Sequence, residues 1–202
     1  MRYTYRHIGI LTISLIVASC SFSKKQANNN HDKDMNPNVK LVVLDPGHFH
    51  ASLLQKNPLA SVNDTIRVYA PEGAEVKQYL NDINSYNQRA ENPTSWKEEI
   101  YIGNDYLSRM IADRQGDVVV LAGNNQKKTN YILEAIKAGY NVLSDKPLAI
   151  NKKDFDLLIQ AYQLAQERKL LLYDLMTERY DILNIIEKAL LNNPDLFGKL
   201  QK

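Results

Sequence analysis

The apolar run VKLVVLD at residues 39–45 already narrows the choice of folds for this chain. It is rich in β-branched side chains and is followed by Pro46 and Gly47, which is typical of a strand buried on both faces. Such strands occur mostly in parallel sheets, whose neighbouring strands are joined by crossover helices. We therefore expect an α/β fold built on a parallel sheet.

The rest of the chain repeats this pattern. Five further strand candidates are residues 66–70, 99–103, 117–123, 140–145 and 169–174. Helical periodicity separates several of them, at residues 74–90, 127–138 and 153–168. In the last of these helices the expected core-facing stripe comprises Phe155, Leu158, Ile159, Tyr162, Leu164 and Ala165. Strands that alternate with helices of this length predict a Rossmann-like, doubly wound parallel sheet.

A different pattern precedes the folded body. Arg2 and Arg6 lie before an apolar run at residues 8–17, which is shorter than a typical membrane-spanning helix but suits the core of a signal peptide. The run ends in Val-Ala-Ser-Cys at Cys20, which resembles the bacterial lipobox. We expect residues 1–19 to be a lipoprotein signal peptide and Cys20 to carry the lipid. A core cysteine on an ordinary helix is less favoured, because Cys20 lies where the apolar run meets a polar tail.

The segment at residues 20–38 holds few large apolar side chains and many Asn, Lys, Asp and Ser residues. It cannot bury enough surface to fold, so we expect a disordered tether. A lipid anchor followed by a tether predicts a protein of the cell envelope that is bound to a membrane. In a Gram-negative cell this would be the outer membrane or the periplasmic face.

Composition excludes several classes of function. The chain has 25 Lys and Arg residues against 23 Asp and Glu residues, and removal of Arg2 and Arg6 with the signal peptide would leave 23 of each. This balance offers no basic face for nucleic acid. The single cysteine, Cys20, excludes an intrachain disulfide, a cysteine-based zinc site and an iron–sulfur cluster.

Unusual residues follow four of the predicted strands, where ligands of doubly wound folds bind. These junctions are residues 45–51 (DPGHFHA), 122–125 (AGNN), 145–147 (DKP) and 177–180 (TERY). Their order and spacing resemble those of the Gfo/Idh/MocA family, which includes glucose–fructose oxidoreductases and inositol dehydrogenases. The resemblance covers about residues 39–200 and is most specific over residues 117–150.

The resemblance implies a domain organisation. Residues 39–180 would form a Rossmann-like NAD(P)-binding domain, and residues 181–202 a helix and the start of a substrate domain. The chain would then be C-terminally truncated, with the second, substrate domain missing. It would be the nucleotide-binding portion of an oxidoreductase.

The cofactor implied by the resemblance is NAD or NADP. The residues expected to contact it are Gly47, His48, Phe49, Glu72, Asn125 and Asp145. Glu72 is the acid expected to hold the ribose hydroxyls after the second strand, and Asn125 has the alternative role of capping the next helix. Only Gly47 remains of the GxGxxG phosphate-binding turn, and Pro46 lacks a backbone N–H.

The reaction implied by the resemblance is hydride transfer between a sugar or polyol and the nicotinamide, with Lys146 polarising the substrate hydroxyl. The family's catalytic histidine belongs to the substrate domain, so we expect the isolated chain to be inactive. Lys128 stands where the family commonly has His, and Thr177 where it has Asn. The expected partners are the dinucleotide, the sugar or polyol and the membrane, and a homo-oligomer of the full-length protein is left open.

Two other functions remain alternatives. A non-catalytic carbohydrate-binding or scaffold lipoprotein is favoured by the loss of the glycines from the turn. The second alternative is a glycosidase relative that recycles a tightly held NAD. Asp45, His48 and His50 would supply three metal ligands, but the strand-turn-helix context already explains their positions, and we expect no metal.

Overall fold

The computed structural model describes residues 39–175, 178 and 180–198. Outside these residues lie the predicted signal peptide at 1–19, the lipidated Cys20, the tether at 20–38, and Thr177. The described part of the chain contains a sheet of six strands that all pair in parallel.

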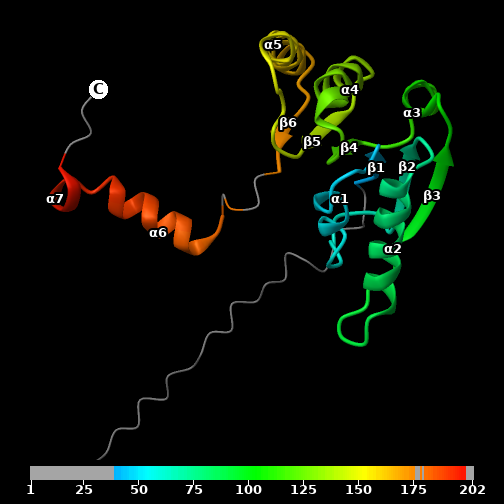
Figure 1. The fold of residues 1–202 in the computed structure, drawn as a ribbon, viewed down its shortest axis with the longest axis horizontal. Helices are drawn as coiled ribbons and strands as arrows, with labels where there is room; N and C mark the ends of the chain where they lie inside the picture. Colours follow the sequence, from blue (N-terminus) through cyan, green and yellow to red (C-terminus); the bar gives the residue numbers. More distant parts are fainter. Residues whose placement is uncertain (1–38, 176–177, 179, 199–202) are drawn as a thin grey trace, which may run out of the picture. The chain divides into compact units, whose positions relative to one another are not determined.

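The six strands lie in the order β3-β2-β1-β4-β5-β6. Their bounds are β1 Leu41–Leu44, β2 Thr65–Ala70, β3 Lys97–Ile102, β4 Val118–Leu121, β5 Asn141–Ser144 and β6 Leu172–Asp174. Figure 1 shows β3 and β6 at opposite edges of the sheet and β1 beside β4 in the middle. The strand order reverses between β1 and β4, so the switch point, where such folds bind ligands, lies there. The predicted Rossmann-like fold is confirmed.

The described helices are α1 His50–Leu53, α2 Ala74–Gln88, α3 Tyr106–Asp113, α4 Asn125–Lys137, α5 Lys152–Glu167, α6 Ile182–Leu191 and α7 Pro194–Phe197. The long helices predicted from periodicity correspond to α2, α4 and α5. The helix expected after the turn at residues 45–51 corresponds to α1, and the helix expected within residues 181–202 corresponds to α6, whereas the sequence did not predict α3 or α7. None of the helices in the described ranges is both long and apolar enough to cross a membrane.

Alternate side chains of the central strands enter two separate cores. On one face, Val42 and Leu44 of β1 pack with residues of α3, α4 and α5, among them Met110 and Ile136. On the other face, Leu41 and Val43 pack with residues of α2. Each such fully buried side chain stabilises the fold by about 1.5–3 kcal/mol. Burial on both faces explains why these strands are continuous apolar runs in the sequence.

The predicted stripe of α5 is partly wrong. The buried positions are Leu158, Ala161 and Ala165, whereas Phe155 and Ile159 are 54% and 41% exposed. Helix α5 follows β5, leads to the edge strand β6 and packs against α4. Its buried side chains are Leu158, Ala161 and Ala165, and Leu164 of the predicted stripe is partly buried beside them. A wide apolar stripe in the sequence therefore does not correspond to a wide buried face.

Candidate functional site

The loops after β1 and β4 meet backbone to backbone at the switch point. The N–H groups of Gly47 and His48 both donate to the carbonyl oxygen of Ala122, at 2.9 and 3.0 Å. A Cβ atom at Gly123 would lie 2.2 Å from the carbonyl oxygen of Asp45, so only glycine fits there. Two backbone donors of the turn after β1 are thus already used inside the protein, which leaves fewer of them for a phosphate group.

Asp45 is held by α4 and does not approach the histidines of its own loop. Its backbone is in the left-handed region, with φ of 48°, and its Oδ2 accepts a hydrogen bond from the Tyr131 hydroxyl at 2.7 Å. The Tyr131 hydroxyl also contacts the hydroxyl of Tyr106. Burial, together with these two neighbours, raises the pKa of Tyr131, so its hydroxyl is a neutral donor. The metal-ligand set of Asp45, His48 and His50 weighed from the sequence is therefore not assembled.

Asp145, at the end of β5, takes the place beside the two histidines. Its Oδ1 lies 2.9 Å from Nδ1 of His50, and its Oδ2 lies 3.3 Å from Nδ1 of His48. The Asp145 side chain is only 3% exposed, whereas that of His48 is 38% exposed. Burial and the neighbouring His50 lower the pKa of His48, outweighing the carboxylate. Two imidazoles thus converge on one buried carboxylate.

A buried lysine supports the segment that carries Asp145. Lys128 of α4 is 2% exposed, and its Nζ donates to Oδ1 of Asn125 at 2.8 Å and to the carbonyl oxygen of Asp145 at 3.1 Å. Burial lowers the pKa of Lys128. The N-cap of α4 is Asn124, whose Oδ1 accepts from the N–H of Gln126, so the capping role considered for Asn125 is wrong.

Lys146 directly follows this buried corner and is itself exposed. The peptide bond between Lys146 and Pro147 is cis, and the carbonyl oxygen of Lys146 lies 3.5 Å from Nζ of Lys128. The side chain of Lys146 therefore extends from a segment whose backbone is fixed by α4.

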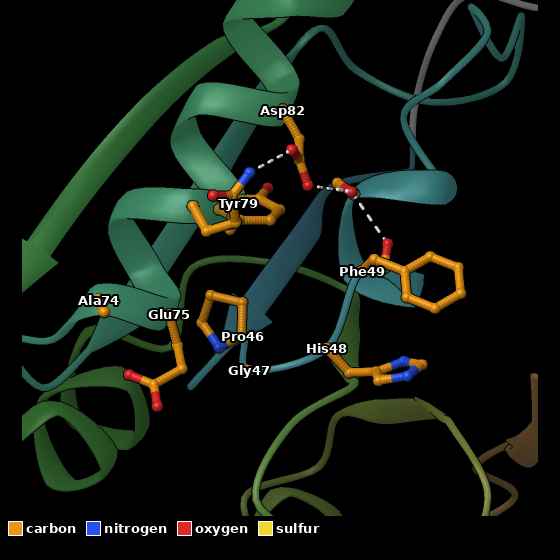
Figure 2. Close-up of a pocket in the computed structure, with 10 residues that line it drawn as sticks. Pro46, Gly47, His48, Phe49, Ala74, Glu75, Tyr79 and Asp82 are labelled. Carbon is orange, nitrogen blue, oxygen red and sulfur yellow. Dashed lines mark hydrogen bonds between the residues drawn. The ribbon is translucent and has the colours of Figure 1, made fainter.

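A cavity of about 300 Å³ lies between the turn after β1 and helix α2. Figure 2 shows Pro46, Gly47 and His48 on one side and Ala74, Glu75 and Tyr79 on the other. Its lining residues are Pro46, Gly47, His48, Phe49, Ser52, Ala74, Glu75, Gln78, Tyr79 and Asp82. Two of the lining residues, Glu75 and Asp82, are acids, and His48 is a third ionisable residue of the lining. Asp82 is already engaged, because Ser52 and Gln78 donate to its two carboxylate oxygens.

Comparison with protein families agrees with this architecture. The model of the Gfo/Idh/MocA family, described as an oxidoreductase family with an NAD-binding Rossmann fold, matches residues 46–173, which is more than half of the chain. The chain belongs to the Gfo/Idh/MocA oxidoreductase family. Among curated proteins, none matches it.

Three solved structures resemble this member of the Gfo/Idh/MocA family. A predicted oxidoreductase from Parabacteroides merdae is 47% identical, with a TM-score of 0.79, over 82% of this chain and 38% of the other. Biliverdin reductase from Synechocystis sp. PCC 6803, in complex with biliverdin and NADP+, is 17% identical, with a TM-score of 0.56, over 81% and 45%. A myo-inositol 2-dehydrogenase from Lactobacillus plantarum is 15% identical, with a TM-score of 0.55, over 79% and 42%.

At 17% and 15% identity, the similarity to the biliverdin reductase and to the myo-inositol 2-dehydrogenase shows the fold alone. The chain spans less than half the length of each of these three relatives.

Within this Gfo/Idh/MocA domain the structure separates the predicted site residues into two groups and one outlier. Gly47, His48 and Phe49 line the cavity, while Asn125 and Asp145 lie at the corner held by Lys128. His48 joins the two groups, because its Nδ1 lies 3.3 Å from the Asp145 carboxylate. The outlier is Glu72, which is exposed, lies 3.7 Å from Lys77, and does not line the cavity. Glu75, three residues further along and in the first turn of α2, does line the cavity, as does Asp82. The sequence alone does not show that the helix places Glu75, and not Glu72, at the cavity wall.

Proposed function

We propose that this chain is the dinucleotide-binding part of a dehydrogenase that oxidises an alcohol group of a sugar or polyol. The observation that carries the proposal is the corner after β5, where the exposed Lys146 extends from a segment fixed by the buried Lys128. A cation held in place at the carboxyl ends of parallel strands is suited to interact with a substrate oxygen. Membership of an NAD-binding oxidoreductase family supports this chemistry.

The residues around the switch point fit a nicotinamide dinucleotide. The cavity beside Gly47 is large enough for part of such a ligand, and Glu75 on its wall would accept hydrogen bonds from ribose hydroxyls. The bound dinucleotide would supply the hydride acceptor. Phe49 and Gly47 would hold its adenosine half, while Asn125 and Asp145 lie toward the corner of Lys146.

Lys146 would act on the substrate. Its ammonium donates a hydrogen bond to the hydroxyl oxygen and stabilises the negative charge that develops there when the hydroxyl proton is removed. The proton acceptor that the family uses is a histidine of the substrate domain, so we infer that turnover requires the length of chain that the relatives have. Removing the ammonium by Lys146→Met should then lower kcat for the complete enzyme by about 10²–10⁴.

A purified sample of the chain provides a direct test. We expect one NAD or NADH to bind per chain in a calorimetric or fluorescence titration, without sugar-dependent reduction of NAD. Lys137→Met is a matched control for Lys146→Met, because Lys137 is a surface residue of α4 that pairs with Glu134. The proposal fails if the folded chain binds neither nucleotide and carries none as purified.

A second candidate is a non-catalytic carbohydrate-binding lipoprotein that retains the fold. It is favoured by the hydrogen bonds from Gly47 and His48 to Ala122, which occupy donors that a phosphate would need. Sugar binding without any dinucleotide binding would support this candidate over the dehydrogenase.

We also propose that the protein is anchored in the cell envelope by a lipid on Cys20. The small residues before Cys20 and the polar segment after it support this location. In the native host, Cys20→Ala should abolish incorporation of labelled palmitate and release the protein from the membrane fraction. Retention of the variant in that fraction would contradict the anchor.

A further inference from the structure

The His48, His50 and Asp145 side chains form a cluster to which the proposed hydride transfer assigns no proton or charge, although His48 and Asp145 are also expected dinucleotide contacts. The two histidines lie at the start of α1, and Asp145 lies at the end of β5. His50 and Asp145 are 95 residues apart in the sequence. One candidate ligand atom from each residue lies within 4.8 Å of the other two. The fold itself therefore brings two imidazoles and a carboxylate together.

The spacing of these atoms fits a small divalent ion. In a tetrahedral zinc site with bonds of about 2.0–2.1 Å, neighbouring ligand atoms lie roughly 3.3 Å apart. The distances from the two Asp145 oxygens to the histidine Nδ1 atoms are 2.9 and 3.3 Å. Each histidine nitrogen faces a different oxygen of the same carboxylate, and the three ligand atoms lie within 4.8 Å of one another, so one ion could contact all three residues.

The rigidity of the cluster supports the same conclusion. Asp145 is buried, and its backbone is bonded to Lys128 and to Leu121, so the carboxylate is fixed in place before any ion binds. The side chain of His50 is 11% exposed, and that of His48 is 38% exposed. The exposed side at His48 leaves room for a fourth ligand from water or a bound molecule, as in zinc sites with three protein ligands.

The kinds of ligand atom in the cluster select among metals. Lys128 and Lys146 lie near His48 and Asp145, and their charge opposes all divalent ions alike, so the difference between metals has to come from their ligands. Magnesium and calcium require several oxygen ligands, and this cluster offers only one carboxylate. Imidazole nitrogens suit zinc, copper and nickel. Selectivity should therefore come from coordination bonds to the two histidines.

We propose that His48, His50 and Asp145 bind a divalent transition-metal ion, with Zn²⁺ as the best match, and leave one coordination position open. This site is independent of whether the protein is a dehydrogenase. It lies beside the turn that carries Gly47, and His48 also lines the cavity of Figure 2.

The test is a metal titration of the full chain in a His7→Ala and His31→Ala background, which removes the two histidines outside the cluster. Folding is checked by circular dichroism. We expect one Zn²⁺ per chain, and a Co²⁺ complex with the visible absorption of a tetrahedral N and O site. His48→Gln and His50→Gln should each weaken Zn²⁺ binding by about tenfold or more. Asp45→Asn is the matched control, because Asp45 lies in the same loop but bonds Tyr131.

Several outcomes would overturn the metal site while leaving the dinucleotide proposal intact. These are no Zn²⁺ binding by the folded protein, Zn²⁺ affinity unchanged in both histidine variants, or an affinity for Mg²⁺ equal to that for Zn²⁺. Dinucleotide titration of the same samples without metal reports separately on the proposed function.

Discussion

The Nζ atom of Lys128 lies 3.1 Å from the carbonyl oxygen of Asp145, and this contact joins α4 to the corner that carries Lys146. Lysine is almost never fully buried unless it is paired. Here its partners are the side chain of Asn125 and backbone carbonyl groups, while the Asp145 carboxylate is left to the histidines. Lys128 thus positions the segment before Lys146 without contacting a ligand itself.

Replacing Lys128 should destabilise the protein. Lys128→Met keeps most of the apolar stem but removes the donor to Asn125 Oδ1, and leaves the carbonyl oxygen of Asp145 with only the longer bond from the Ser144 hydroxyl. This should lower the free energy of unfolding by about 1–3 kcal/mol. Lys137→Met removes only a surface ion pair with Glu134 and should cost no more than about 1 kcal/mol. Urea denaturation of both variants checks this, and equal midpoints would contradict the positioning role.

The fold was predictable because its central strands are buried on both faces and so form continuous apolar runs. The four-residue α1 was expected only from its strand-turn-helix context, because His50-Ala-Ser-Leu53 is too short to show a helical period. The burial of Lys128 could not be predicted, since a lysine in a helical sequence is normally exposed. Its partner, the carbonyl group of Asp145, lies 17 residues away. Local patterns contain no information about such contacts.

The candidate site was predictable in its position but not in its pairings. The junction residues do meet at the carboxyl ends of the strands, as the topology requires. Sequence proximity favoured Asp45 as the partner of the histidines, but its left-handed backbone turns it toward Tyr131, and Asp145 takes its place. Pairing of this kind depends on sheet order and loop conformation, which short sequence patterns do not specify.

Gly123 should tolerate no side chain. In Gly123→Ala the new Cβ would lie 2.2 Å from the carbonyl oxygen of Asp45, a backbone atom that cannot move without separating the two loops. We expect a loss of about 1–3 kcal/mol in the free energy of unfolding, as for other overpacked sites. In the control Gly73→Ala the nearest atom is the mobile end of the Glu75 side chain, so the cost should stay under about 1 kcal/mol. Thermal denaturation of the two variants measures the difference.

The cavity predicts a preference for NAD over NADP. In the described structure its lining residues include two acids and no Lys or Arg, so a 2′-phosphate would meet the Glu75 carboxylate without a compensating cation. We expect NADPH to bind at least about tenfold more weakly than NADH, a difference of about 1.4 kcal/mol, in parallel fluorescence titrations. Glu75→Gln should reduce this ratio.

The same titrations decide which acid holds the ribose. Glu72→Gln tests the assignment made from the sequence, since Glu72 lies on the surface near Lys77. If Glu72→Gln weakens NADH binding more than Glu75→Gln does, the role of the cavity wall is wrong and the loop before α2 moves to meet the ligand.

Glu98 should make the stability depend on pH. It lies on β3, its Oε1 accepts a hydrogen bond from the buried Gln55 at 3.2 Å, and burial raises its pKa. Because the folded state then holds the proton more tightly than the unfolded state, the free energy of unfolding falls as the pH rises from the ordinary glutamate pKa through the raised one. Above that window the loss is complete.

Replacing the Glu98 carboxylate tests whether the free energy of unfolding falls, as expected, when the pH rises. Glu98→Gln keeps an oxygen for Gln55 and cannot ionise, so it should be more stable than the wild type at neutral pH and similar to it below the ordinary glutamate pKa. Glu91→Gln, at an exposed position, should follow the wild-type pH profile. Chemical denaturation across the acidic and neutral range gives both profiles, and a Glu98→Gln protein that loses stability at neutral pH would show that the ionised carboxylate stabilises the edge of the sheet.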